Sequence, residues 1–253
     1  NPKAGDEIRI AGSSLIGQVG SSIQYLSIGI GTTPPTVSKT TLTVNLNLNS
    51  TTSRVQELLR AVAFFSGSDS PSSVVRNVRI TLTDGEGGKM ARGRGVLVIP
   101  VNDTPSIDVA PSVNYQRNTS AGVAFAANAF VTDVDSFSIA GGELQISVAG
   151  GDTQKNRILL SGTAFTIDGS GNLLRAGLII GALNPNAGLG VNSFRVTFNS
   201  NARLGHAQLL LRSLRFGTVA SNSNLDRQLT IRLNDGDGGL GNVIRNVIVK
   251  VTS

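Results

Sequence analysis

Few residues in this chain could carry catalytic chemistry. Its 253 residues include one histidine, His206, and no cysteine. A Ser-His-Asp triad or a histidine-rich metal centre therefore lacks the side chains that it needs. Paired carboxylates could hydrolyse glycosides, but aromatic residues that would form sugar-binding platforms make up only 4% of the chain. We predict that the protein is not an enzyme and that His206 lies at a helix terminus or on the surface.

Arginine supplies most of the positive charge. The formal net charge is +6, and only five of the 22 basic residues are lysines. A guanidinium group can form paired hydrogen bonds with carboxylate, sulfate and phosphate groups. An acidic polysaccharide is therefore a candidate partner. The candidate ligand-binding residues lie in or beside two predicted hairpins: Arg79, Arg92, Arg94, Arg232 and Arg245. The alternative is a solvated face that discourages edge-to-edge aggregation. Nucleic acid is not expected, because aromatic residues are scarce and no basic helix is evident.

The two hairpins are the elements that must position these arginines. Residues 78–105 and 229–253 each contain an alternating strand, a turn rich in Gly and Asp, and a second alternating strand. Alternation at period two, with β-branched residues on one face, is typical of a strand that is half covered by a core. We expect each hairpin to close a domain.

Two segments change from strand to helical periodicity. In Ser53–Phe64, residues Leu58, Leu59 and Val62 fall on one helical face, and Gly205–Phe216 is the second predicted helix. The segments with the clearest period-two alternation are Thr40–Leu48, Glu143–Ala149 and Ser193–Asn199. We therefore predict that the chain is mostly β-strand, with one short helix in each half.

Three landmarks recur at nearly one period. Leu58-Leu59-Arg60 returns 152 residues later as Leu210-Leu211-Arg212, Asp84 returns after 151 residues as Asp235, and Val101 returns after 150 residues as Val251. Repetition at a fixed period indicates duplicated structural units. We predict two domains, residues 1–104 and 105–253.

The same period leaves the first unit incomplete at its N-terminus. It contains no counterpart of residues 105–149, which should supply several strands of the second unit. A β-sandwich without those strands cannot cover its core, and its sheet edges are open to pairing. We expect the missing strands to come either from upstream chain in a longer repeat protein or from another subunit by strand donation.

The motifs have a characteristic order. The segment DVDS at 133–136 precedes a long middle region, which leads to a Gly-Asp turn (ITLTDGEGG or IRLNDGDGG) and, in the first unit, to a strand that ends in VNDTP. This order resembles the cadherin-like repeats of very large secreted or surface bacterial proteins, over almost the whole chain. The resemblance implies tandem Greek-key β-sandwiches, an extracellular or cell-surface location, and no catalytic activity.

The resemblance also implies calcium at the junction between repeats. The candidate metal ligands are Asn102, Asp103, Asp133, Asp135 and Asp235. Calcium takes about six to eight oxygen ligands, mostly carboxylates and carbonyls, and a cluster of carboxylates would repel itself without a cation. The alternative is that Asp and Asn beside Gly act as ordinary turn formers. The low acidic count of this basic chain counts against calcium, and both interpretations stay open.

These observations predict a structural or adhesive extracellular module: a spacer, surface-layer component or fibre component that assembles by strand complementation and is stiffened by calcium. Its partners would be neighbouring repeats or identical subunits. The alternative function is the binding of an acidic polysaccharide through the arginine-bearing hairpins. The sequence contains no apolar run long enough for a membrane span, and it is compatible with secretion.

Overall fold

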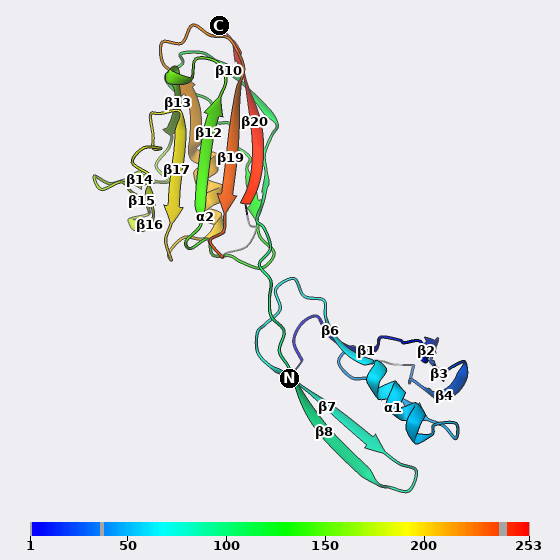
Figure 1. Ribbon diagram of the computed structural model, residues 1–253. Coiled ribbons are helices and arrows are strands. Elements are labelled where there is room, and N and C mark those ends of the chain that lie inside the picture. Colours follow the sequence, from blue (N-terminus) through cyan, green and yellow to red (C-terminus); the bar gives the residue numbers. More distant parts are fainter. Residues whose placement is uncertain (1, 36–37, 238–241, 253) are drawn as a thin grey trace. The chain divides into compact units, whose positions relative to one another are not determined.

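The computed structural model describes residues 2–35, 38–237 and 242–252. The chain divides into two compact units, unit 1 (residues 1–101) and unit 2 (residues 102–253) (Figure 1). The described residues of each unit are mostly β-strand with one α-helix, as the sequence predicts. The border lies at 101/102 rather than at the predicted 104/105, because Asn102 and Asp103 hydrogen-bond to residues of unit 2.

Unit 2 contains one large sheet. Its elements are β9 (Ser106–Asp108), β10 (Ser112–Gln116), β11 (Phe130–Thr132), β12 (Glu143–Ala149), β13 (Asn156–Leu160), β14 (Thr166–Ile167), β15 (Asn172–Arg175), β16 (Leu178–Leu183), β17 (Ser193–Phe198), α2 (Leu204–Ser213), β18 (Leu214–Thr218), β19 (Arg227–Asn234) and β20 (Asn242–Thr252). The order of the sheet is β10-β20-β19-β12-β17-β16-β15-β14, and only β10 and β20 pair in parallel. Two smaller antiparallel pairs, β9 with β11 and β13 with β18, complete the unit.

Strand β12 lies in the middle of that sheet. It is hydrogen-bonded to β19 along one edge and to β17 along the other. Its alternate residues Leu144 and Ile146 are fully buried, as are Leu229, Ile231 and Leu233 of β19. The predicted period-two alternation therefore corresponds to a real buried face, which packs into one core with residues of α2 and β18.

Helix α2 lies behind the sheet in Figure 1 and closes the core. Its buried residues follow a three-to-four spacing: Leu204, Ala207, Leu210 and Leu211. The backbone N–H of Arg203 donates to Nδ1 of His206 at 3.2 Å, so His206 caps the helix start. The helix ends at Ser213, before the predicted end at Phe216, because residues from Leu214 onward pair with β13 as strand β18.

Unit 1 contains three small sheets. Its elements are β1 (Asp6–Ile10), β2 (Ile16–Val19), β3 (Ser22–Tyr25), β4 (Ile28–Thr32), β5 (Asn45–Leu46), α1 (Thr52–Ala61), β6 (Val62–Ser66), β7 (Arg76–Thr83) and β8 (Lys89–Val96). The sheets are β1-β6, β2-β3-β4-β5 and the hairpin β7-β8. The core is small, with Ile16, Ile23, Ile30, Leu58 and Ala61 as its buried residues. Helix α1 stops at Ala61 rather than at the predicted Phe64, because β6 starts at Val62 and pairs with β1.

Each strand and helix described in unit 1 has a counterpart in unit 2. The pair β1-β6 corresponds to β13-β18, α1 to α2, β2-β3-β4-β5 to β14-β15-β16-β17, and the hairpin β7-β8 to β19-β20. Equivalent side chains make equivalent hydrogen bonds. Two asparagine amides donate to a single carbonyl oxygen in each unit: Asn47 and Asn49 to Gly29, and Asn199 and Asn201 to Ile179.

The strand register corrects one landmark of the repeat. Arg76 lies opposite Val96, and its equivalent Arg227 lies opposite Val249. Val96 therefore corresponds to Val249 at an offset of 153 residues, and the match of Val101 with Val251 was wrong. The difference arises at the hairpin turn, which spans from Thr83 to Lys89 in unit 1 but from 234 to 242 in unit 2.

Within the described part of unit 1, no strand corresponds to β12. Strand β7 pairs only with β8, whereas its equivalent β19 pairs with β20 and β12. The predicted strand Thr40–Leu48 is correspondingly reduced to Asn45–Leu46, which pairs with β4 alone. The alternating sequence is present, but a strand also needs hydrogen-bonding partners, and the partner that β12 supplies in unit 2 is missing here.

Candidate functional site

The candidate metal ligands lie around the first residues of unit 2. Asp235 follows directly after β19 and is fully buried. Its Oδ2 accepts a hydrogen bond of 2.8 Å from the side-chain amide of Asn102, and its Oδ1 accepts one of 3.1 Å from the backbone N–H of Asp237. Asn102 and Asp235, which are 133 residues apart, are thus direct partners.

Asp133 and Asp135 lie in the loop after β11. Oδ1 of Asp133 accepts hydrogen bonds from the backbone N–H groups of Asp135 and Ser136, at 3.1 and 3.3 Å. Oδ2 of Asp135 accepts one from the backbone N–H of Asp103 at 2.8 Å. The hydrogen bonds to Oδ1 of Asp133 form an ordinary Asx turn, as the turn-former interpretation predicts. The hydrogen bond from Asp103 to Asp135 instead links the loop to the residue that follows Asn102.

The electrostatics of the loop are those of two carboxylates in contact. Burial and the neighbouring Asp135 carboxylate raise the pKa of Asp133 to about 6. Contact with the Asp133 side chain lowers the pKa of Asp135. Oδ2 of Asp133 is buried and makes no hydrogen bond. A cation or a shared proton would relieve both the repulsion between the two charges and the desolvation of this oxygen.

The structure thus joins the five predicted ligands in two groups. Asn102 holds Asp235, and the backbone of Asp103 holds Asp135, which contacts Asp133. Across residues 2–35, 38–237 and 242–252, no three acidic or histidine side chains form a group that could hold a metal ion. The oxygen donors and the buried Oδ2 of Asp133 suit a hard cation in chemical type, but the protein carboxylates that converge are two rather than three.

The arginines of hairpin β7-β8 point to two sides. Arg92 lies opposite Ile80 and Arg94 lies opposite Val78, so these two arginines share one face of the hairpin. Arg79 lies opposite Gly93 and therefore faces the other way. All three arginines are exposed, but only Arg92 and Arg94 are brought together on one face.

The two arginines of unit 2 are also separated. Arg232 faces outward from β19, opposite Gln145 and Ile244. Arg245 lies opposite the buried Ile231, and its Nε donates to the carbonyl oxygen of Ile107 in β9 at 2.7 Å. Arg245 therefore ties two layers of the unit together and has a structural role that the sequence did not indicate.

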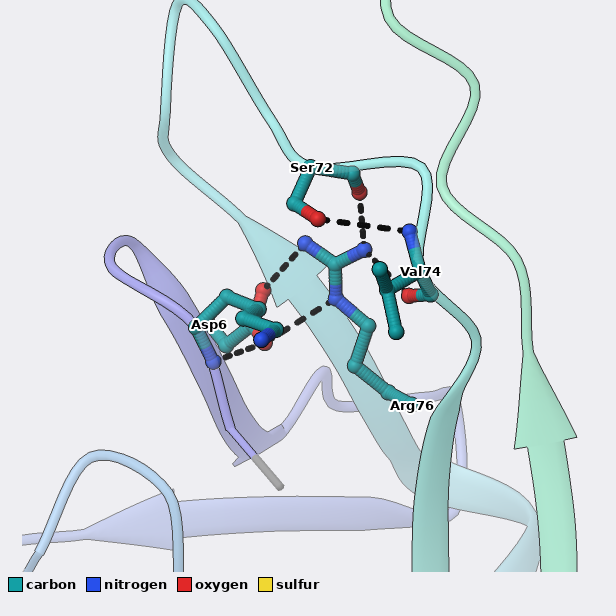
Figure 2. Close-up of polar contacts among 5 residues, drawn as sticks. Asp6, Ser72, Val74 and Arg76 are labelled. Carbon is teal, nitrogen blue, oxygen red and sulfur yellow. Dashed lines mark hydrogen bonds and ion pairs between the residues drawn. The ribbon is translucent and has the colours of Figure 1, made fainter.

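A buried arginine in each unit was also missed from the sequence. Arg76 donates from Nε to Oδ2 of Asp6 at 3.1 Å, and its Nη1 donates to the carbonyl oxygens of Ser72 and Val74 (Figure 2). Burial alone would raise the pKa of Asp6, but the hydrogen bonds from Arg76 and the backbone hold it below its ordinary value. The carboxylate of Asp6 and the guanidinium are both almost fully buried.

Arg227 repeats this arrangement in unit 2. Its Nε donates to Oδ1 of Asn156 at 3.2 Å, its Nη1 to the carbonyl oxygens of Ser223 and Leu225, and its Nη2 to Oγ of Ser221 at 3.1 Å. A Cβ atom on Gly151, whose φ is +58°, would lie 2.2 Å from the guanidinium carbon, so the site requires glycine there. The recurrence of Ser, an aliphatic residue and Arg at alternate positions (72, 74, 76 and 223, 225, 227) was the sequence signal for these anchors.

Comparison with known proteins identified no relative of this chain. No family model matches the chain, and no curated protein matches its sequence. Neither of the two helices in the described ranges has the length and apolar character needed to cross a membrane.

Proposed function

We propose that the chain is a structural and adhesive module of a bacterial extracellular or cell-surface repeat protein, related to cadherin-like repeats and acting as a spacer, surface-layer component or fibre component. The observation that carries this proposal is the recurrence of the elements of unit 1 in unit 2, including the buried arginine anchor. Repeats of this kind gain length by adding units, and their function depends on how each unit is held to the next. The proposal assigns no catalytic role, and His206 serves as a helix cap.

Calcium is the second part of the proposal. Asp133 and Asp135 would hold the ion, and Asn102, Asp103 and Asp235 would support it through the contacts already described. A bound Ca²⁺ would supply positive charge to two adjacent carboxylates. The backbone N–H of Asp103 donates to Asp135. A calcium ion that holds the carboxylates of Asp133 and Asp135 in place would therefore also restrain the residues that lead into unit 2.

The test is calcium binding by isothermal titration calorimetry on the whole chain, with small-angle scattering in calcium and in EDTA. We expect binding that is lost in Asp135→Asn and kept in Asp108→Asn, an exposed aspartate of β9. We also expect calcium to narrow the distribution of interatomic distances that scattering gives for the two-unit chain. Scattering profiles that are identical with and without calcium would contradict stiffening, and an absence of heat would remove calcium from the proposal.

An acidic polysaccharide is the second candidate partner, and the exposed pair Arg92 and Arg94 on one face of the hairpin favours it. The double variant Arg92→Ser/Arg94→Ser should elute earlier from immobilised sulfated or uronic-acid glycan as salt is raised. Arg60→Ser, which removes an exposed arginine from α1 of the same unit, is the matched control. Equal elution of the wild-type chain and both variants would exclude the hairpin as the binding face.

A further inference from the structure

The outer face of the large sheet in unit 2 is polar. It lies on the side of the sheet opposite α2 and the core (Figure 1). Along the three central strands, outward side chains alternate with buried ones. None of the outward side chains is aliphatic and larger than alanine, so this part of the face suits a polar ligand. They are Glu143, Gln145, Ser147 and Ala149 of β12, Ser193, Arg195 and Thr197 of β17, and Gln228, Thr230, Arg232 and Asn234 of β19.

Two arginines lie in one row across these strands. Arg232 of β19 lies opposite Gln145 of β12, and Gln145 lies opposite Arg195 of β17. Neighbouring strands are about 4.8 Å apart, so the backbones of the two arginines are about 10 Å apart, with the glutamine between them. The row therefore presents a cation, a neutral amide and a second cation. We call these three residues the Arg-Gln-Arg row.

Both guanidinium groups can reach a ligand. Nε of Arg195 lies 2.6 Å from Oε2 of Glu143, yet the Arg195 side chain is 45% exposed. A guanidinium has five N–H donors, so this contact leaves donors for a second anion. Arg232 is exposed and forms no ion pair with any residue of 2–35, 38–237 and 242–252. The row thus has more positive charge than its one acidic neighbour balances.

The next row along the sheet consists of hydroxyl groups. Thr230, Ser147 and Ser193 lie opposite one another on β19, β12 and β17. Oγ1 of Thr230 is 2.9 Å from Oδ1 of Asn246 on β20, so the row continues onto a fourth strand. These short side chains leave space beside the arginines, and their hydroxyl groups can exchange hydrogen bonds with the hydroxyl groups of a sugar.

We propose that the Arg-Gln-Arg row binds a linear polysaccharide in which acidic and neutral sugars alternate, with the polysaccharide lying across the strands. A pyranose residue in an extended chain is about as long as one strand spacing. Two acidic sugars separated by a neutral sugar would therefore place their carboxylates at Arg232 and Arg195. The neutral sugar would lie over Gln145, whose amide both donates and accepts hydrogen bonds.

The inference rests on the second candidate function, the binding of acidic polysaccharide, and gives it a site in unit 2 in addition to hairpin β7-β8. Charge complementarity selects the class of ligand, because a guanidinium pairs with a carboxylate through two parallel hydrogen bonds. The spacing of the two arginines selects the alternation of acidic and neutral sugars.

The experiment is an NMR titration of the whole ¹⁵N-labelled chain with a hyaluronan tetrasaccharide, in which uronic acid alternates with a neutral amino sugar. We expect saturable shift changes centred on the backbone amides of Arg232, Gln145 and Arg195. The carboxyl-reduced tetrasaccharide should cause none. A hyaluronan disaccharide has one carboxylate and cannot span both arginines, so it should bind about three- to tenfold more weakly.

Variants test each arginine separately. Arg232→Ser and Arg195→Ser should each weaken tetrasaccharide binding by about three- to tenfold. Arg157→Ser is the matched control, because it removes the same charge from the same unit but from β13, which pairs with β18 outside the large sheet. Circular dichroism of each variant should confirm that unit 2 remains folded.

Four outcomes would overturn the proposal. The first is a titration without shift changes at the Arg-Gln-Arg row, and the second is binding that Arg157→Ser weakens as much as Arg232→Ser does. The third is binding that only Arg92→Ser/Arg94→Ser reduces, which would leave polysaccharide binding to hairpin β7-β8. The fourth is the absence of binding to any acidic oligosaccharide, which would remove the second candidate function as well.

Discussion

Replacing Arg227 by methionine is the sharpest test of the fold. The side chain is fully buried and donates to four groups, of which Asn156 and Ser221 are themselves fully buried. Leaving a buried polar group without its partner costs about 1–3 kcal/mol. The carbonyl oxygens of Ser223 and Leu225 belong to residues that are partly or fully exposed, so we expect water to hydrate them and the other two groups to dominate the loss.

The expected loss of stability is therefore about 2–5 kcal/mol, with methionine retaining part of the packing volume. For a unit of this size that corresponds to a fall in melting temperature of about 5–15 °C. Arg227→Lys should recover only part of the loss, because an ammonium group cannot reproduce the planar fork. Arg232→Met, which changes an exposed arginine of the same strand, should stay within about 0.5 kcal/mol of wild type.

The assay is urea unfolding of fluorotyrosine-labelled chain by NMR. The chain has two tyrosines, Tyr25 in unit 1 and the buried Tyr115 in unit 2, so each unit gives its own signal. Separate signals avoid treating two units as one transition. Only the Tyr115 midpoint should fall in Arg227→Met. A midpoint no lower than that of Arg232→Met would refute the view that Arg227 anchors unit 2.

Three further predictions concern titration and a buried hydroxyl. The lowered pKa of Asp6 stabilises unit 1 above the ordinary carboxyl range and loses that effect as pH falls, so acid should shift the Tyr25 transition, and Asp6→Asn should flatten this dependence. The pKa of Asp133 is raised to about 6, so its effect on stability is opposite to that of Asp6: the stability of unit 2 falls as pH rises from about 4 to about 6. Asp133→Asn should therefore raise the melting temperature in EDTA at pH 7 and remove any rise caused by calcium, whereas Asp108→Asn should do neither. Tyr115→Phe removes the oxygen that accepts the backbone N–H of Thr218 at 2.9 Å and should cost unit 2 about 1–3 kcal/mol by circular dichroism, while Tyr25→Phe should change unit 1 little.

Local sequence patterns were sufficient for the elements and their repetition. The alternation of Leu229, Ile231 and Leu233 predicts a strand with one buried face, because side chains point to opposite sides at period two. The spacing of Val55, Leu58 and Leu59 predicts helix α1 for the same kind of reason at period 3.6. Helix ends were less well predicted, since Leu214 and Phe216 suit a helical face as well as a strand.

Partners across the sheet were beyond the reach of these patterns. Thr40–Leu48 alternates as clearly as β17 does, yet only Asn45–Leu46 forms a strand, since the hydrogen bonds of a strand must come from another segment. The contact of Asn102 with Asp235 joins residues 133 positions apart. Asp133 and Asp135 share a loop, but their opposite pKa shifts arise from burial and from their mutual contact.

The sequence by itself determined that this protein is a duplicated, strand-rich chain with one helix per unit, because periodicity and repetition are properties of the chain alone. The tertiary structure decided which strands have partners, which arginines anchor a unit, which stay exposed, and which lie in one row across a sheet. The physical reason is that burial and hydrogen bonding depend on segments that meet only after folding.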